Sequence, residues 1–300
     1  MTEARPRVWV SQPLFDDVIE RLREHFDVNA ASEVTQYAPE QITAALRDVD
    51  GALITLNEGI GATQLKGAAR LRAIANVGVG YNNLDIPALQ AVGIVATNTP
   101  DVLTETTADF GFALMMATAR RITESERWLR EGHWQQWSFQ TMLGADLHGS
   151  TLGILGMGRI GQAIARRASG FDMRVLYHNR SRLPEAIERE ARASYAGFDE
   201  LLAQADHLML VLPYSKQNHH LIDARALLQM KPTATLVNIA RGGIVDEDAL
   251  VDALAGGRLA AAGLDVFEGE PAVNPRLLAQ RNVVLTPHIA SGSLATRRAM

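Results

Sequence analysis

Short runs of β-branched residues alternate with longer amphipathic stretches along this chain, and no other feature constrains its fold as strongly. The amphipathic stretches, such as residues 15–25 and 39–46, repeat apolar side chains every three or four positions, as helices do. Strands that alternate with helices pair in parallel, so the sequence predicts an α/β fold. We expect strands at 8–10, 52–55, 71–76, 94–97, 151–155, 174–177, 207–212, 234–239, 261–265 and 283–286.

The expected strands fall into two series, separated by an uninterrupted helical pattern over residues 102–131. A chain of 300 residues is also longer than a single hydrophobic core usually supports. We therefore expect two Rossmann-like units, each a doubly wound parallel sheet, connected by one long helix. A single α/β barrel is the alternative.

The composition excludes several classes of function. The formal net charge is −5 and the charges are interspersed, so the chain offers no basic stripe for nucleic acid. It has no cysteine, which removes disulfides and thiolate chemistry. The first residues lack the apolar core of a signal peptide, and no later apolar run reaches the roughly 20 residues that span a bilayer. We expect a cytoplasmic protein without a membrane partner.

A glycine-rich segment between an expected strand and an expected helix predicts a dinucleotide site. Gly156, Gly158 and Gly161 have the G-x-G-x-x-G spacing, which allows a tight turn, close approach of a pyrophosphate and close packing of the helix. The amides near Arg159 and Ile160, at the start of that helix, would face the phosphates.

The end of the next expected strand indicates which dinucleotide is bound. NAD-binding units carry an acid there for the adenosine ribose, but this chain reads Asn179-Arg180-Ser181-Arg182. Arginine and serine side chains can bind a 2′-phosphate by charge-assisted hydrogen bonds. The sequence therefore favours NADP(H), with NAD(H) as the alternative.

Three polar residues follow strands of the second series, at the edge where a doubly wound sheet binds its ligands. They are Arg241, Glu270 and His288. A guanidinium can hold a substrate carboxylate and polarise a keto oxygen. An imidazole can protonate the alkoxide that hydride delivery leaves, and a carboxylate on its other ring nitrogen would orient it. The set predicts reduction of a 2-keto acid, with His288 as acid and Glu270 as its partner.

Four segments resemble, together and in order, the signature segments of the D-2-hydroxyacid dehydrogenases. They are Gly156-Met-Gly-Arg-Ile-Gly161, Asn238-Ile-Ala-Arg-Gly-Gly243, Gly263-Leu-Asp-Val-Phe-Glu-Gly-Glu-Pro271 and Pro287-His-Ile-Ala-Ser291. The likeness runs from about residue 50 to the end. It implies a flavodoxin-like substrate domain, residues 1–98 with 288–300, and a dinucleotide-binding domain, residues 99–287, with the active site in the cleft. A helix after His288 would return to the substrate domain, and 293–299 allow about two turns of it.

The resemblance also implies roles outside the catalytic set. The loop 76–83 looks like the one whose amides, around Val77 and Gly78, meet the substrate carboxylate. Asn57 follows an expected strand and is a candidate for the far end of the substrate, with a plain loop role equally open. The residues implied to line the cofactor are Thr106, Leu212, Pro213, Ile239, Ala240, Arg241, Asp265 and His288.

The missing acid and the segment Val102-Leu-Thr-Glu-Thr106 resemble the glyoxylate/hydroxypyruvate and 2-ketogluconate reductase branch. We expect NADPH-dependent reduction of glyoxylate or hydroxypyruvate. One alternative is an NAD-dependent dehydrogenase of another acid, of the 2-ketogluconate, D-lactate or D-3-phosphoglycerate type. Another is a nucleotide-sensing scaffold without activity, as in corepressors that resemble this family.

Two further features bear on partners. By the resemblance, the stretch around Trp134 and Trp137 belongs to a homodimer interface of the nucleotide-binding domain, where tryptophans are common. The pair His219-His220 suggests a metal, but adjacent histidines on a helix or strand point apart, and no acid or cysteine stands at a ligand spacing. We expect no metal site.

Overall fold

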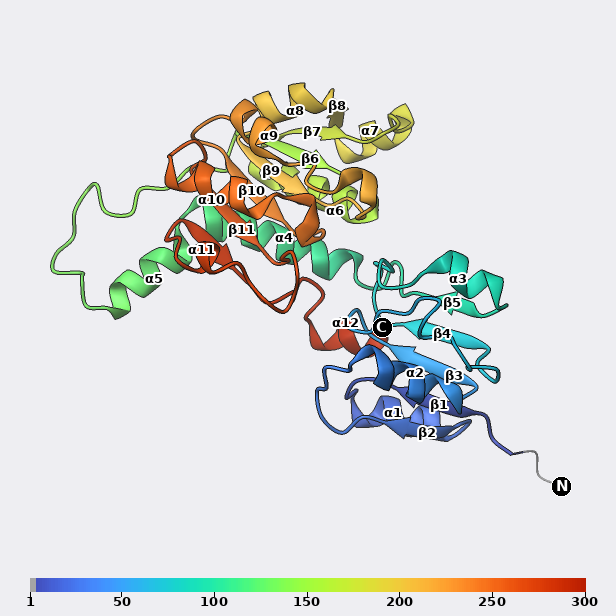
Figure 1. Ribbon diagram of the computed structural model, residues 1–300. Coiled ribbons are helices and arrows are strands. Elements are labelled where there is room, and N and C mark those ends of the chain that lie inside the picture. The colour runs from blue at the N-terminus through green and yellow to red at the C-terminus, as the bar shows by residue number, and fades with distance from the viewer. Residues whose placement is uncertain (1–3) are drawn as a thin grey trace. The chain divides into compact units, whose positions relative to one another are not determined.

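The chain folds into two α/β units in the computed structural model, which describes residues 4–300 (Figure 1). One unit holds the chain up to Leu103 together with Ser293–Met300, and the other holds Thr104–Gly292. These boundaries lie a few residues from the expected ones, and they place the turn that carries His288 in the second unit. The prediction of an α/β fold with two parallel sheets is confirmed.

The first unit contains a five-stranded parallel sheet in the order β2-β1-β3-β4-β5, which is the flavodoxin-like order. Its strands are β1 (Arg7–Val10), β2 (Asp27–Ala30), β3 (Gly51–Ile54), β4 (Ala73–Asn76) and β5 (Val95–Thr97). Its helices are α1 (Asp16–Arg23), α2 (Pro39–Arg47), α3 (Ile86–Ala91) and α12 (Leu294–Ala299).

Apolar residues at alternating strand positions and at one face of each helix form the core of the first unit. Ile54 and Ile74 of the sheet pack with Leu46 of α2 and Leu89 of α3, and all four are almost fully buried. The last helix joins this unit through a cation–π contact, because the Arg298 guanidinium lies 5.2 Å from the centre of the Phe15 ring.

The second unit contains a seven-stranded parallel sheet in the order β12-β11-β10-β9-β6-β7-β8, a Rossmann order with an added strand. The strands are β6 (Thr151–Leu155), β7 (Arg174–His178), β8 (Ala193–Tyr195), β9 (His207–Leu210), β10 (Thr235–Asn238), β11 (Ala261–Leu264) and β12 (Val283–Leu285). The α-helices are α4 (Thr104–Ala119), α5 (Ile122–Arg130), α6 (Arg159–Ala168), α7 (Glu185–Ala191), α8 (Phe198–Gln204), α9 (Ala224–Gln229), α10 (Glu247–Ala255) and α11 (Pro275–Leu278). Short 3₁₀ helices are η1 (Ser169–Phe171), η2 (Lys216–Asn218) and η3 (Gly242–Ile244).

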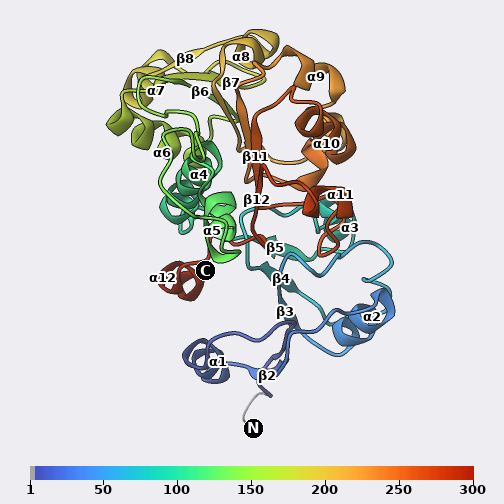
Figure 2. The ribbon, with the colours of Figure 1, turned by 90° about the vertical axis from the view of Figure 1, so that its left-hand side faces the viewer.

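Helices cover both faces of the second sheet, and each face has its own core. Helices α4, α6 and α7 pack on one face, while α8, α9 and α10 pack on the other; Figure 2 shows α9 and α10 opposite α4 and α6. Strands β9 and β10 are buried along their whole length because both of their faces are covered.

Helix α4 packs closely on the sheet, and Gly263 of β11 makes this approach possible. A Cβ atom at Gly263 of β11 would lie 2.4 Å from Thr118 Oγ1 and 3.0 Å from Leu114 Cγ. The Thr118 hydroxyl is itself fixed by donating to the Leu114 carbonyl, at 2.8 Å. The helix therefore has little room to move away from an added methyl group.

The structure differs from the sequence prediction at three elements. The expected single helix over 102–131 is wrong: α4 ends at Ala119 and α5 begins at Ile122, with Arg121 between them in a left-handed conformation, φ 53°. The Ala119 carbonyl instead accepts a hydrogen bond from Ala145. Strands β2 and β8 were not predicted, because each is a short edge strand with few apolar side chains. Within residues 4–300, no helix is both long and apolar enough to cross a bilayer.

We predict that Gly263→Ala destabilises the second unit by about 1–3 kcal/mol, because the added methyl group overpacks the contact between α4 and β11. Urea denaturation would measure this change. Gly170→Ala is the matched control: its Cβ would meet no atom within 4 Å, and it should alter stability by less than about 0.5 kcal/mol. Equal effects of the two substitutions would contradict the close packing of α4.

Candidate functional site

The carboxyl ends of five neighbouring parallel strands gather the predicted residues at one edge of the second sheet. Residues following β6, β9, β10, β11 and β12 include Gly156, Leu212, Arg241, Asp265 and His288, respectively. Strand order reverses between β6 and β9, and such a switch point is where doubly wound sheets bind ligands. The sheet thus accounts for the convergence of residues that are far apart in the sequence.

The glycine-rich turn after β6 has the geometry that its spacing predicts. Gly156 has φ +104°, and a Cβ there would lie 2.7 Å from the Leu212 amide nitrogen, so only glycine fits. A Cβ at Gly161 would lie 2.4 Å from the Gly156 carbonyl oxygen. At Gly158, the first residue before α6, a Cβ would meet no protein atom within 4 Å. This glycine leaves the helix N-terminus accessible, as phosphate binding requires.

The residues after β7 are divided between the turn and an internal ion pair. Asn179 Oδ1 accepts a hydrogen bond from the Met157 amide at 2.8 Å, so this side chain supports the glycine-rich turn. Arg182 donates through Nε and Nη2 to the two carboxylate oxygens of Glu188, at 2.9 and 2.8 Å. Arg182 is therefore largely committed within the protein, which leaves Arg180 and Ser181 as the better candidates for a phosphate.

Glu188 was missed by the sequence analysis, although it organises this corner of the unit. Its carboxylate also accepts the hydroxyl of buried Tyr177 at 2.7 Å. Hydrogen bonds from Arg182 and then Tyr177 lower the pKa of Glu188 to about 2. Burial and the bond to Glu188 raise the pKa of Tyr177 to about 12. Glu188 is the fourth residue of α7, and nothing in the sequence indicated that its side chain would contact residues at the end of β7.

His288 and Glu270 are in direct contact. His288 Nδ1 lies 2.7 Å from Glu270 Oε2, and both side chains are about one-third exposed. An ionised carboxylate can only accept, so Nδ1 carries the proton and the imidazole presents Nε2 outward from the pair. Burial raises the pKa of Glu270, but the hydrogen bond and charge of His288 outweigh it, and the net shift is downward. The pair has the geometry of an oriented acid.

A buried carboxylate holds the turn on which His288 sits. Asp265 Oδ1 accepts from the Thr286 hydroxyl at 2.7 Å and the Ile289 amide at 2.8 Å, and Oδ2 accepts from the Ala290 amide at 2.9 Å. The Asp265 side chain has no exposed surface, and burial raises its pKa despite these bonds. Asp265 therefore holds this turn in place, and its predicted place beside the cofactor stays a prediction.

Arg241 precedes a glycine that packs against the segment leading to Glu270. Burial lowers the pKa of Arg241, while the charge of Glu270 acts in the opposite direction, so the two groups are within electrostatic range. Its Nη1 donates to the Ala240 carbonyl at 2.7 Å. The next residue packs against the strand-to-loop segment that carries Glu270, since a Cβ at Gly242 would lie 1.8 Å from the Phe267 carbonyl carbon. Arg241, Glu270 and His288 thus belong to one cluster of the second unit.

The remaining cofactor candidates occupy the same region of the second unit or its first helix. Leu212 and Pro213 follow β9, and the backbone of Leu212 touches the glycine-rich turn. Ile239 and Ala240 are buried just after β10. Thr106 lies in the first turn of α4, Arg159 and Ile160 open α6, and each is partly or largely exposed.

In the first unit, the amides predicted to meet the substrate are already used. The Val77 amide donates to the Ile54 carbonyl at 2.8 Å, and the Gly78 amide donates to the Asn76 carbonyl at 2.9 Å. The neighbouring candidate Asn57 is exposed, next to Glu58, whose buried carboxylate accepts bonds from residues 11, 12 and 55. Neither predicted amide is therefore available to a carboxylate in this conformation.

The amides of the next three residues, 79–81, point away from the groups that bind the carbonyls of residues 78–80. The carbonyls of Gly78, Val79 and Gly80 accept at 2.9–3.0 Å from Thr99 N, Asn98 Nδ2 and Asn76 Nδ2. In a trans peptide the N–H points opposite to the C=O. The amides of Val79, Gly80 and Tyr81 consequently face the other way, which makes them better donors than those at 77 and 78.

Comparison with known proteins places this geometry in context. Residues 112–290 match the family model described as D-isomer specific 2-hydroxyacid dehydrogenase, NAD binding domain. The glyoxylate reductase of Thermococcus gammatolerans is 46% identical over 300 residues, covering 99% of this chain and 90% of that protein. The Pyrococcus furiosus glyoxylate reductase is 44% identical, with 99% and 89% covered. A solved NADPH-dependent glyoxylate/hydroxypyruvate reductase from Sinorhizobium meliloti, in complex with NADP and malonate, has a TM-score of 0.87, 37% identity and coverage of 99% and 90%.

We predict that Glu188→Gln lowers stability at pH 7 and that the difference from wild type narrows as the pH falls from about 4.5 towards 2. The pKa of Glu188 is lowered to about 2 in the folded chain, so its ionised form stabilises the fold above the unfolded value near 4.5. That stabilisation is lost as the pH falls through the pKa of Glu188 in the folded chain. Urea unfolding of both proteins at several pH values would measure the difference in their free energies of unfolding.

Glu185→Gln is the matched control for this experiment. Glu185 lies in the same helix and pairs with Arg189, but both side chains are more than two-thirds exposed. Exposed pairs of this kind contribute little to stability. A Glu185→Gln curve that matched the Glu188→Gln curve would show that the Tyr177–Glu188–Arg182 network is not special.

Proposed function

This chain belongs to the D-isomer specific 2-hydroxyacid dehydrogenases, and we propose that it reduces small 2-keto acids such as glyoxylate and hydroxypyruvate with NADPH. The family resemblance drawn from its motifs is confirmed by the match over 112–290 and by relatives 40–46% identical over the whole chain. It is accordingly a nicotinamide-dependent oxidoreductase. Among these relatives, those named glyoxylate reductase support this choice of substrate.

The carrying observation is the 2.7 Å contact between His288 Nδ1 and Glu270 Oε2, with Arg241 in electrostatic range. In the proposed reaction, Arg241 binds the substrate carboxylate and polarises the keto oxygen. His288 donates its Nε2 proton to that oxygen as negative charge develops there. Glu270 keeps the imidazole oriented through the bond to Nδ1. Asp265 takes no part in the proton transfer; it fixes the turn that carries His288.

The residues present fit a dinucleotide. Gly158 leaves the start of α6 open, while Gly156 and Gly161 have no room for a side chain, so the turn can bring its backbone against a pyrophosphate. We assign the phosphates to this turn with Arg159 and Ile160, and the cofactor groove to Thr106, Leu212, Pro213, Ile239 and Ala240. When bound, the nicotinamide supplies the hydride.

The proposed preference for NADPH rests on Arg180 and Ser181. No acid occupies 179–182, and the carboxylate of Glu188, which Arg182 and Tyr177 contact, is buried. A 2′-phosphate near this strand end would meet positive charge and a hydroxyl instead of a carboxylate. The alternative is an NAD-linked dehydrogenase of another 2-hydroxy acid.

The unit with Val79, Gly80 and Tyr81 is proposed as the substrate domain. The N–H groups of these three residues face away from the partners of the preceding carbonyls, and backbone amides of successive residues can bind a carboxylate. We further propose a homodimer through the dinucleotide-binding domain, because Trp134, Trp137 and Phe139 expose 53%, 73% and 82% of their surface after α5.

We predict that His288→Ala lowers kcat/KM for glyoxylate with NADPH by about 10²–10⁴, because the proton donor is lost. The thermal midpoint should change little, since the side chain is partly exposed and the turn is held by Asp265. His148→Ala is the matched control: its imidazole also pairs with an acid, Asp172, but on the surface. Wild-type turnover by the His288→Ala enzyme would refute the mechanism. Absent turnover of any keto acid by wild type would favour a non-catalytic scaffold.

We predict that Arg180→Ala raises KM for NADPH about 10- to 100-fold while KM for NADH stays within about twofold, because one charge-assisted bond to the 2′-phosphate disappears. Steady-state kinetics with both coenzymes would measure the ratio. Arg189→Ala, an exposed arginine of α7 paired with Glu185, is the control and should change neither constant. A wild-type enzyme that prefers NADH, or equal losses with both coenzymes, would rule out the assignment.

A further inference from the structure

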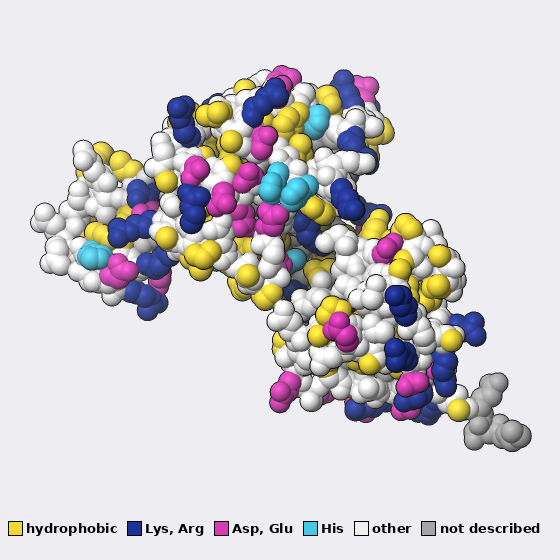
Figure 3. Space-filling model, viewed as in Figure 1, with side chains coloured by type: hydrophobic (Ala, Val, Ile, Leu, Met, Phe, Trp, Pro, Cys, Tyr) yellow, Lys and Arg dark blue, Asp and Glu magenta, His cyan; other side chains and the backbone are white. Residues whose placement is uncertain are grey.

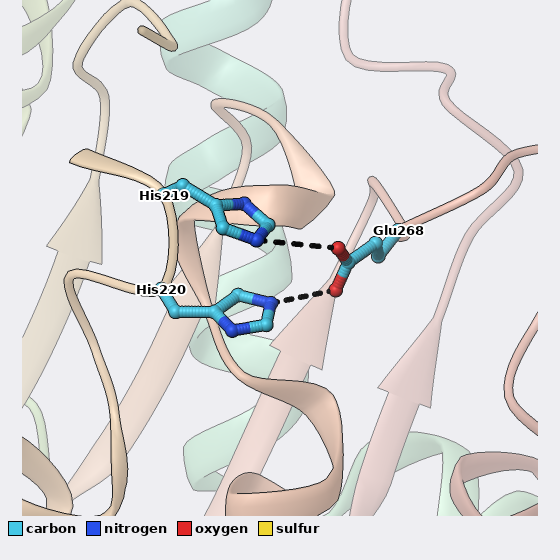
Figure 4. A group of neighbouring side chains, drawn as sticks. All are labelled: His219, His220 and Glu268. Carbon is cyan, nitrogen blue, oxygen red and sulfur yellow. Dashed lines mark hydrogen bonds and ion pairs between the residues drawn. The ribbon is translucent and has the colours of Figure 1, made fainter. Parts of the chain in front are cut away.

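Two histidines and a glutamate converge on the second unit, apart from the His288–Glu270 pair (Figure 4). His220 Nε2 lies 2.8 Å from Glu268 Oε2, and His219 Nε2 lies 3.8 Å from Glu268 Oε1. The two imidazoles are stacked, with ring centroids 3.8 Å apart and an angle of 24°. All three ligand atoms lie within 4.8 Å of one another, so both rings present a nitrogen to the same carboxylate.

The backbone explains why these adjacent histidines do not point apart. That expectation applies to regular helices and strands, whereas His219 ends η2 with φ −62° and ψ 128°, and His220 is left-handed with φ 51°. The His220 amide is fixed by donating to the Gly243 carbonyl at 2.8 Å. A left-handed non-glycine residue costs free energy and is common at functional sites. The acid comes from 48 positions later, which no spacing rule could indicate.

We propose that His219, His220 and Glu268 bind a divalent transition-metal ion of the zinc class. Two imidazoles and a carboxylate are a donor set that zinc accepts, and three protein ligands leave the fourth position to water. Imidazole nitrogen favours zinc, copper or nickel over magnesium and calcium. Each side chain is 35–43% exposed, so an ion can enter from solvent.

A fourth side chain orients one of the ligands. The Tyr214 hydroxyl lies 3.2 Å from His219 Nδ1. Histidines that bind metal through one ring nitrogen commonly hydrogen-bond through the other, which fixes the tautomer and the ring. Tyr214 thus holds His219 with Nε2 towards Glu268.

The surroundings favour a cation. A cavity of about 370 Å³ is lined by His220 and Glu268 and also by Asp246, Glu247 and Asp248. Figure 3 shows histidine and acidic side chains gathered on one face of this unit. A concave surface lined by one sign of charge raises the local concentration of the opposite ion.

The proposed ion would bind the same short segment that carries Glu270 of the catalytic pair. Glu268 lies two residues before Glu270, its amide donates to Glu247 Oε1 at 2.7 Å, and the Phe267 amide donates to Glu270 Oε1 at 2.8 Å. Fixing Glu268 between two histidines would also fix the segment that positions Glu270. Metal binding itself does not depend on the proposed reaction.

Calorimetric titration of zinc into the untagged, chelator-treated full chain tests the site. We expect one ion per chain, and at least about tenfold weaker binding for His219→Ala, His220→Ala and Glu268→Gln. Tyr214→Phe should weaken binding about 10-fold, as expected for a residue that orients a metal ligand. Zinc at a hundred times its dissociation constant should raise the thermal midpoint of wild type by about 5 °C.

Two control variants locate the ion. His148→Ala removes an exposed histidine paired with Asp172 and should bind zinc as wild type does. His288→Ala should also bind it normally. No binding to wild type, unchanged binding to Glu268→Gln and His220→Ala, or loss of binding in His288→Ala would each overturn the proposal. Because calorimetry does not use turnover, these outcomes are separate from failure of the proposed reaction.

Discussion

The proposed site depends on the hydrogen bonds between the Asp265 carboxylate and the turn that carries His288. This carboxylate is fully buried at the end of β11, and its oxygens accept one hydroxyl and two amide hydrogens from the turn after β12. Desolvation of a carboxylate is costly and is offset only when its hydrogen bonds are complete. These hydrogen bonds hold the turn in the conformation in which His288 has φ 53°. A surface loop without such an anchor would not fix the His288 imidazole, whose Nδ1 lies 2.7 Å from Glu270 Oε2.

The second constraint is the contact between the segments after β10 and β11. Gly242 lies so close to the Phe267 backbone that no side chain fits between them. This contact brings Arg241 and Glu270 together because each is only a few residues from it. Parallel neighbours β10 and β11 supply the register, Asn238 opposite Leu264. Positioning of the guanidinium and the carboxylate is thus a property of the backbone before it is a property of their own hydrogen bonds.

The sequence predicted the parts of this site that local spacing and sheet topology determine. The glycine-rich turn can be recognised from spacing, and parallel strands bring Arg241, Glu270 and His288 to one edge whatever lies between them. It could not predict which donors remain available after folding. Arg182 is captured by Glu188, and the amides of Val77 and Gly78 are used inside the first unit, so in both places the candidates shift to neighbouring residues. These choices depend on side-chain directions and on peptide orientation, which no periodicity records.

The same limit explains the two different uses of the segment after β11. Glu268 faces His220 and Glu270 faces His288, although only Gly269 separates the two acids. Gly269 has φ +81°, a conformation that side chains rarely adopt, so the chain can turn between them and aim the carboxylates at different partners. A third acid completes the arrangement: Glu247 accepts the Glu268 amide, and burial, together with the charges of Glu268, Asp248 and Glu270, raises its pKa. The three carboxyl groups can lie close together because each has its own partner: Glu268 and Glu270 each contact an imidazole, and Glu247 accepts a backbone amide. One glycine in the left-handed region is what allows a single short segment to serve both histidine sites.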